Sequence, residues 1–197
     1  MTRVVMPAWN ANGVIPPVSS AAPASAERSP YAVSLSEFVL RFASSAKRQQ
    51  ILAGYLRYRG RLHTAGLTAG FQWLDGSFLE NIETTETRDP NDLDVVTFFS
   101  VPVGVTQQQL QTQAPDLFPI TAGERALIKS SFSVDPYLVS LGSRAPLLVK
   151  QCTYWYSMWS HRRDATWKGY LQIDLDPQDD ALAAIQLKAP AIPGGSP

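Results

Sequence analysis

The segment that decides the fold runs from Trp73 to Val96 and reads "WLDGSFLENIETTETRDPNDLDVV". It places Gly76-Ser77 after an apolar pair, then a polar loop, and then Asp92 and Asp94 within a run of apolar residues. Side chains in a strand alternate between faces, so the two aspartates would share one face while their apolar neighbours enter the core. Two carboxylates this close repel each other unless a cation lies between them. The segment therefore predicts either a strand whose start frays or a strand that holds a positive charge.

Composition excludes several other classes of protein. A chain of 197 residues fits one domain with a sizeable core. Its 17 Lys and Arg balance its 17 Asp and Glu, so we expect neither a long nucleic-acid track nor recruitment to an anionic membrane. The single Cys and two His exclude an internal disulfide and disfavour a zinc site. We see no signal peptide and no bilayer-spanning apolar run, so we expect a cytoplasmic protein.

The chain divides by composition into three parts. Residues 1–33 are rich in Pro, Ala and Ser and predict an extended arm, which is either disordered or lies on the domain. Residues 34–188 carry the periodic patterns of a single domain, and residues 189–197 read as a flexible tail.

Helical and strand patterns are mixed along the domain. A capping box at Ser34 opens two helices, or one helix broken near Ser44-Ser45, and further helices are expected at 106–113, 121–129 and 146–159. Strands are expected at 131–141 and 168–175, besides the one that contains Asp94. This order indicates an α+β or α/β fold, with a small mixed β-sheet and flanking helices. The basic residues before and within the second helix are expected on a solvated face; they are the run Lys47-Arg48 together with Arg57, Arg59 and Arg61.

The residue types around Asp92 and Asp94 point to metal and phosphate chemistry. Paired carboxylates are hard oxygen ligands that suit Mg²⁺, which is usually completed by waters and substrate phosphates. Upstream, Gly76 permits close approach of the backbone, and Ser77 offers a hydroxyl and an N–H near a turn. The order is that of a phosphate-binding turn followed by a magnesium site, although an acidic pair is also common at the start of a strand.

This order resembles the signature of the DNA polymerase beta-like nucleotidyltransferases, in which Gly-Ser is followed by a spacer and by Asp-apolar-Asp-apolar. Here the matching residues are Leu74 or Asp75 before Gly76-Ser77, and then 92–95. The spacer, residues 78–91, is slightly longer than is usual in the family, and Asp75 stands where an apolar residue is commoner. The wider layout, with "NGVIPP", a basic helix and "WSHRRDATWKGYLQI", also resembles an uncharacterised bacterial family of small stand-alone members.

The resemblance implies a nucleotidyltransferase-like sheet with a third carboxylate on a neighbouring strand. We prefer Asp135 for that place because it lies in a predicted apolar strand, although Pro136 beside it is awkward in a ladder, and Asp174 is the alternative. Asp92, Asp94 and Asp135 would then be the catalytic, metal-binding residues, with Mg²⁺ or Mn²⁺ as cofactor. The nucleotide-binding residues would be Gly76 and Ser77, helped by the basic cluster of Arg162, Arg163 and Lys168.

The activity implied is transfer of a nucleoside monophosphate from an NTP, such as ATP, to an acceptor hydroxyl on a protein, an RNA or a small molecule. The short chain leaves no obvious second domain to select a substrate, which is typical of toxin-antitoxin or phage-defence modules. The alternative is a degenerate, non-catalytic member that binds nucleotide or a partner and acts as an antitoxin or sensor. A structural or assembly role would leave the aspartates without a purpose.

Overall fold

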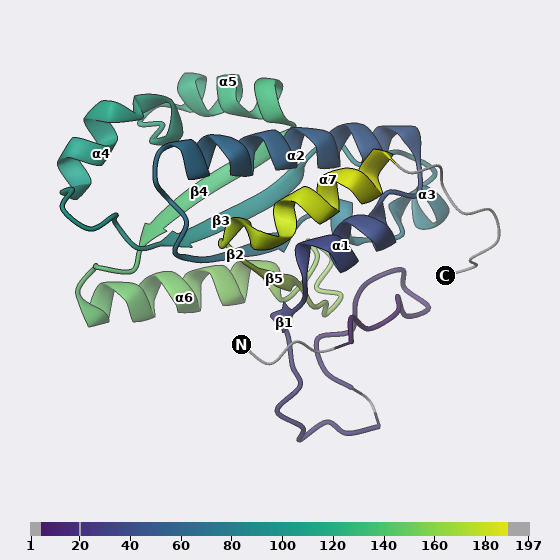
Figure 1. Cartoon of the computed structure of the whole chain (residues 1–197). Coiled ribbons are helices and arrows are strands. Elements are labelled where there is room, and N and C mark those ends of the chain that lie inside the picture. Colours follow the sequence, from purple (N-terminus) through teal and green to yellow (C-terminus); the bar gives the residue numbers. More distant parts are fainter. Residues whose placement is uncertain (1–4, 20, 189–197) are drawn as a thin grey trace.

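The computed structural model describes residues 5–19 and 21–188 (Figure 1). Within these ranges the chain forms a mixed sheet whose strands lie in the order β1-β5-β2-β3-β4. Strand β2 runs antiparallel to β3 and β5, whereas β3 is parallel to β4 and β1 is parallel to β5. The small mixed sheet and its flanking helices confirm the predicted α+β class. The strands are β1 (Tyr31–Ala32), β2 (Gly70–Asp75), β3 (Leu93–Phe99), β4 (Val134–Ser140) and β5 (Leu171–Asp174).

Helices cover both faces of this sheet. Helix α2 lies on one side together with α1 and α7, and α6 lies on the other (Figure 1). The helices are α1 (Leu35–Phe42), α2 (Ala46–Thr64), α3 (Ile82–Thr85), α4 (Gln107–Gln113), α5 (Ala122–Phe132), α6 (Ala145–Trp159) and α7 (Asp180–Lys188). Short 3-10 turns occur at η1 (Ser77–Leu79), η2 (Pro115–Leu117) and η3 (Pro177–Asp179).

Capping side chains set the starts of several helices, as predicted. Ser34 and Glu37 form a reciprocal capping box at the start of α1, and Thr121 forms one with Glu124 at the start of α5. Ser45 accepts a hydrogen bond from the backbone N–H of Arg48 and so starts α2 as a separate helix. Of the two alternatives for this region, the two-helix one is therefore right.

The predicted strand at 131–141 begins too early. Helix α5 continues to Phe132, and Ser133 then takes a left-handed conformation with φ 54°, so β4 starts only at Val134. Strand β4 lies at the edge of the sheet, where Pro136 costs little because no further strand needs its N–H. The strand predicted at 168–175 is also shorter, and neither β2 nor α7 was expected.

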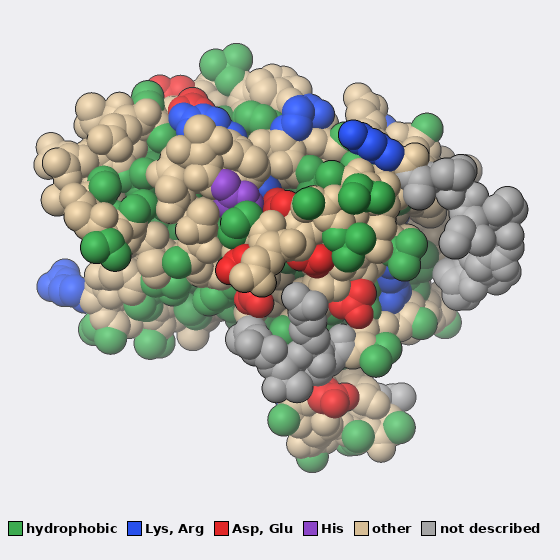
Figure 2. Space-filling view, viewed as in Figure 1, with side chains coloured by type: hydrophobic (Ala, Val, Ile, Leu, Met, Phe, Trp, Pro, Cys, Tyr) green, Lys and Arg blue, Asp and Glu red, His purple; other side chains and the backbone are tan. Residues whose placement is uncertain are grey.

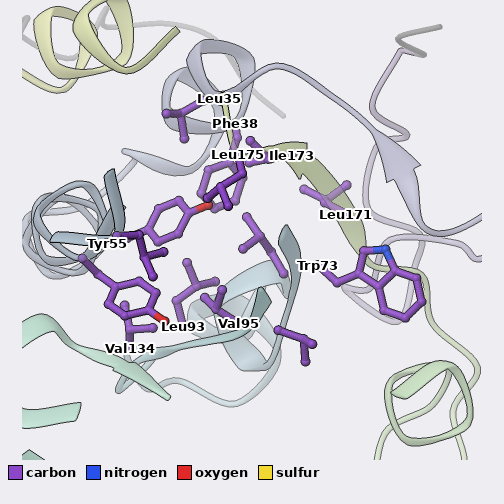
Figure 3. Close-up of a cluster of buried hydrophobic side chains, with 14 of the residues drawn as sticks. Leu35, Phe38, Tyr55, Trp73, Leu93, Val95, Val134, Leu171, Ile173 and Leu175 are labelled. Carbon is purple, nitrogen blue, oxygen red and sulfur yellow. The ribbon is translucent and has the colours of Figure 1, made fainter. Parts of the chain in front are cut away.

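The core lies between the sheet and the helices α1, α2 and α7. Figure 3 shows Leu93 and Val95 of β3 in one cluster with Tyr55 of α2 and Val134 of β4, while Trp73 of β2 lies apart from them. Leu93, Val95, Val134 and Tyr55 are all completely buried. Burial of these apolar side chains supplies the main driving force for packing the helices onto the sheet.

Two arginines of α2 contradict the prediction of a solvated basic face. Arg59 is completely buried, and its guanidinium contacts both carboxylate oxygens of Asp180 at 2.9 and 2.7 Å. Arg48 is 1% exposed and contacts both carboxylate oxygens of Glu83. Each guanidinium can be buried because it forms an ion pair with a carboxylate far away in the sequence. Periodicity within the helix does not reveal such a partner.

The described part of the N-terminal segment lies against the domain. Ile15 is buried and its carbonyl accepts a 2.6 Å hydrogen bond from the N–H of Gly169, while the Trp9 indole donates to the carbonyl of Leu79. Strand β1 then joins the sheet beside β5. The predicted tail at 189–197 lies outside the described residues. Among the described residues, no helix combines the length and the apolar composition needed to cross a membrane.

Candidate functional site

Three aspartates lie side by side at one end of the sheet. The strand register pairs Asp75 of β2 with Asp94 of β3, and pairs Asp94 in turn with Asp135 of β4. We call Asp75, Asp94 and Asp135 the aspartate row. Because directly paired residues of neighbouring strands point to the same face, the three carboxylates lie on one face of the sheet. Asp92 stands just before Leu93, where β3 begins, so the three aspartates predicted to bind metal lie at the same end of the adjacent strands β3 and β4.

Burial and repulsion between carboxylates raise the pKa values of Asp75 and Asp94. Burial, together with the charges of Asp75, Asp92 and Asp135, raises the pKa of Asp94 to about 7, against the opposing charge of Lys129. Burial also raises the pKa of Asp75 to about 6, against the opposing charge of Lys168. Asp94 is thus partly protonated near neutral pH, and an added cation would favour its charged form.

Lys129, in the last turn of α5, supplies a positive charge at this position. Its ammonium contacts Asp92 Oδ2 and lies 3.4 Å from Asp135 Oδ2. Partial burial acts to lower the pKa of Lys129, but the hydrogen bond to Asp92 and the charges of both aspartates raise it overall. The other oxygen, Asp135 Oδ1, is buried and accepts no hydrogen bond from the described residues. Lys129 therefore offsets only part of the charge and hydrogen-bonding capacity of Asp92 and Asp135.

The glycine-serine turn lies directly against Asp94. Strand β2 ends at Asp75, and Gly76 then takes φ 88° before the 3-10 turn η1 starts at Ser77. A Cβ atom at Gly76 would clash with Asp94 Oδ2, so the close contact between the turn and Asp94 requires glycine at this position. Ser77 is half-buried beside this turn. The predicted phosphate-binding turn and the predicted metal ligands are therefore neighbours in space.

Two residues of the predicted basic cluster, Arg162 and Lys168, form ion pairs within the protein. Lys168 is 5% exposed, and its ammonium lies 3.0 Å from Asp75 Oδ1 and 3.0 Å from Glu80 Oε1. Burial opposes its charged form, but the two carboxylates outweigh this effect and raise the pKa of Lys168. Arg162 pairs with Glu80 Oε2 at 2.7 Å. Arg163 is exposed, and within the described ranges it forms no ion pair.

Asp174, the alternative third carboxylate, lies away from the row. It ends β5 and pairs with Phe71, at the other end of β2 from Asp75. Its side chain is exposed. Figure 2 shows acidic side chains gathered beside α7. The segment from the end of β5 to the start of α7 contains four aspartates: Asp174, Asp176, Asp179 and Asp180. Asp135, and not Asp174, is the residue beside Asp94.

Sequence reasoning missed three charged residues of this site. Asp75 was noted only as a departure from the family pattern, yet it belongs to the row. Glu80 lies in the polar spacer and joins Lys168 to Arg162. Lys129 was read only as the end of a helix. Burial along β2 does not alternate, so the sequence pattern contains no signal for Asp75, and the contacts of Glu80 and Lys129 depend on tertiary packing.

The donor atoms of the site fit a hard divalent cation. Carboxylate oxygens suit Mg²⁺ or Mn²⁺, and the buried, unpartnered Asp135 Oδ1 is available as a ligand. In the arrangement described, no group of three or more Asp, Glu, His or Cys side chains within the described ranges is gathered to hold a metal ion. The ammonium of Lys129 lies between Asp92 and Asp135. The residue types thus fit the metal, provided that Lys129 withdraws.

The fold and the row define an α+β protein with an acidic site at one end of a mixed sheet. Residues 7–174 match the model of the Family of unknown function (DUF6932), and the chain belongs to this family. Searches of curated proteins and of solved structures found no significant match. The matched range includes the whole aspartate row and the glycine-serine turn.

Proposed function

We propose that the protein is a metal-dependent nucleotidyltransferase, which moves a nucleoside monophosphate from an NTP to an acceptor hydroxyl. One observation carries this proposal: Asp94 and Asp135 pair directly on adjacent strands, and the turn at Gly76-Ser77 lies against Asp94. Carboxylates beside a turn with available donors can hold a metal–triphosphate complex. This supports the resemblance of the sequence to the nucleotidyltransferases.

Each residue of the site has a role in this proposal. Asp92, Asp94 and Asp135 would hold Mg²⁺ or Mn²⁺, which when bound offsets charge on the triphosphate and acidifies the acceptor hydroxyl. Asp94 would release its proton as the site fills, because a metal ligand must be deprotonated. Gly76 gives the phosphates access to the backbone, and the hydroxyl of Ser77 would donate a hydrogen bond to them.

The basic residues divide between structural and binding roles. Lys168 and Arg162 hold Asp75 and Glu80, so they would orient the turn rather than bind phosphate directly. Arg163 remains the exposed candidate for a phosphate contact. The acceptor would be a protein, an RNA or a small molecule in the cytoplasm, as in a toxin-antitoxin or defence module.

A second candidate function is non-catalytic binding of a nucleotide or partner protein. The observation that favours it is the contact of Lys129 with both Asp92 and Asp135, since an internal cation can replace a metal ion in offsetting their charge. In that case the protein would act as an antitoxin or sensor with a degenerate site.

Label transfer separates the two functions. The protein is incubated with α-labelled NTPs, Mg²⁺ and a lysate of its own cell, and we expect label on a discrete protein, RNA or small molecule together with release of pyrophosphate. Asp92→Ala should abolish transfer, while Asp174→Ala, an exposed aspartate outside the row, should not. Transfer by a folded Asp92→Ala variant would refute the catalytic assignment. Binding of NTP without transfer by the wild type would favour the non-catalytic function.

A further inference from the structure

Two lysines beside the aspartates differ in how firmly they are held. The side chain of Lys168 is 7% exposed and lies between Asp75 and Glu80, deep at the base of the turn. The side chain of Lys129 is 45% exposed and reaches Asp92 and Asp135 from the end of α5. A long, half-exposed side chain at a helix end can swing into solvent at small cost, whereas a buried ion pair cannot separate easily. Lys129 is the exchangeable cation of the site.

The position of Lys129 places it in competition with a divalent ion. Its ammonium contacts two of the carboxylates that would bind the metal, so the metal and the ammonium cannot both occupy the space between Asp92 and Asp135. A free divalent ion must displace the ammonium into water. A metal–triphosphate complex brings its own acceptors, and phosphate oxygens form charge-assisted hydrogen bonds with a lysine.

We propose, building on the proposed function, that Lys129 couples metal binding to nucleotide binding. Its ammonium blocks the metal position when no nucleotide is present, and the triphosphate accepts the ammonium when metal and nucleotide arrive together. The site then discriminates against free Mg²⁺ and favours the metal–NTP complex. Such coupling is a property of binding equilibria and is reciprocal: the metal strengthens NTP binding by the same factor as the NTP strengthens metal binding.

Calorimetric titration of Mn²⁺ tests this role without measuring turnover. Mn²⁺ is added to the full chain with and without a non-hydrolysable NTP. Lys129→Met removes the charge and keeps an apolar stem, Lys129→Arg keeps the charge, and Lys150→Met, on an exposed position of α6, is the matched control. Lys129→Gln provides a second neutral variant if Lys129→Met does not fold, as judged by circular dichroism.

The proposal predicts a specific change in affinity. Without nucleotide, Lys129→Met should bind Mn²⁺ about two- to fivefold more tightly than the wild type, the range expected for loss of a half-exposed competing ion pair. The gain in Mn²⁺ affinity on adding nucleotide should shrink by a similar factor. Lys129→Arg and Lys150→Met should behave as the wild type does.

Two outcomes would overturn the coupling role of Lys129, and they differ in what they imply for the proposed function. Equal Mn²⁺ affinity in the wild type and the neutral Lys129 variants, with label transfer intact, overturns the coupling role and leaves the nucleotidyltransferase proposal standing. Absence of Mn²⁺ binding in every variant, with and without nucleotide, overturns both.

Discussion

Replacing Asp94 with asparagine should stabilise the metal-free protein at alkaline pH. Burial, followed by the charges of Asp75, Asp92 and Asp135, raises the pKa of Asp94 from 3.8 to about 7. A carboxyl group whose pKa is higher in the folded state binds its proton more tightly there, so ionisation of Asp94 opposes folding. The wild type should therefore lose stability as the pH rises from about 4 to about 7. Asp94→Asn has no charge to bury and should not show this loss.

The structure sets the size of this effect. The shift of roughly three pKa units corresponds to about 4 kcal/mol at the upper limit, since each unit is worth about 1.4 kcal/mol. Relaxation of the site and entry of water reduce that value, so we expect Asp94→Asn to raise the free energy of unfolding by about 2 to 4 kcal/mol at pH 8. At pH 4, where Asp94 is protonated in the folded protein, the variant and the wild type should be nearly equal.

Urea unfolding at several pH values, with EDTA present, measures this difference. Asp174→Asn is the control, because it removes an exposed aspartate of the same sheet, outside the row. Its stability relative to the wild type should change little with pH. A difference between Asp94→Asn and the wild type that is constant from pH 4 to pH 8, or that favours the wild type at pH 8, would refute the electrostatic reasoning.

Three further predictions concern the turn and the two lysines. Gly76→Ala should lower the free energy of unfolding by about 1 to 3 kcal/mol in thermal or urea unfolding, because of its positive φ and the clash with the row, whereas Gly60→Ala, at an open position of α2, should be neutral or stabilising. Lys168→Met should lower the free energy of unfolding by about 3 to 5 kcal/mol, because it leaves the buried carboxylate of Asp75 without a cation, whereas Lys129→Met should lower it by less than about 1 kcal/mol; similar losses in the two variants would contradict the difference assigned to these lysines. Ser77→Ala should weaken NTP binding by about 1 to 2 kcal/mol in calorimetry while Mn²⁺ binding persists, and loss of both would mean that Ser77 only supports the turn.

The pair of aspartates could be predicted from sequence because it depends on local alternation. Asp92 and Asp94 flank Leu93, which is completely buried, so a strand with one acidic face follows from two-residue periodicity. The helix starts could also be predicted, because the two residues that form a capping box lie only a few positions apart in the sequence. The preference for Asp135 rested on its position in an apolar segment, and the register places it beside Asp94.

Strand β2 could not be predicted from the sequence because of its polar residues. Gln72 is completely buried, and its side chain accepts hydrogen bonds from Tyr55 and Arg59 and donates one to Thr97. A buried glutamine interrupts the apolar pattern that would mark a strand, and its partners come from α2 and β3. Only the assembled sheet shows that this polar residue belongs to the interior.

The contacts of the lysines could not be read from the sequence for a related reason. Lys168 lies 88 residues from Glu80, and the Lys129 contact depends on how α5 packs beside β4. The sequence predicts that the aspartates need a positive charge. It does not predict that a side chain of the same protein supplies part of it.

Anomalous scattering from crystals soaked with Mn²⁺ and a non-hydrolysable NTP shows directly whether the aspartate row binds a divalent metal ion together with a nucleotide. We expect an Mn²⁺ peak coordinated by Asp94 and Asp135, with the triphosphate beside the turn at Gly76-Ser77 and the ammonium of Lys129 moved away from the carboxylates. Soaked crystals in which Lys129 still contacts Asp92 and Asp135, with no Mn²⁺ peak at the aspartate row, would contradict it.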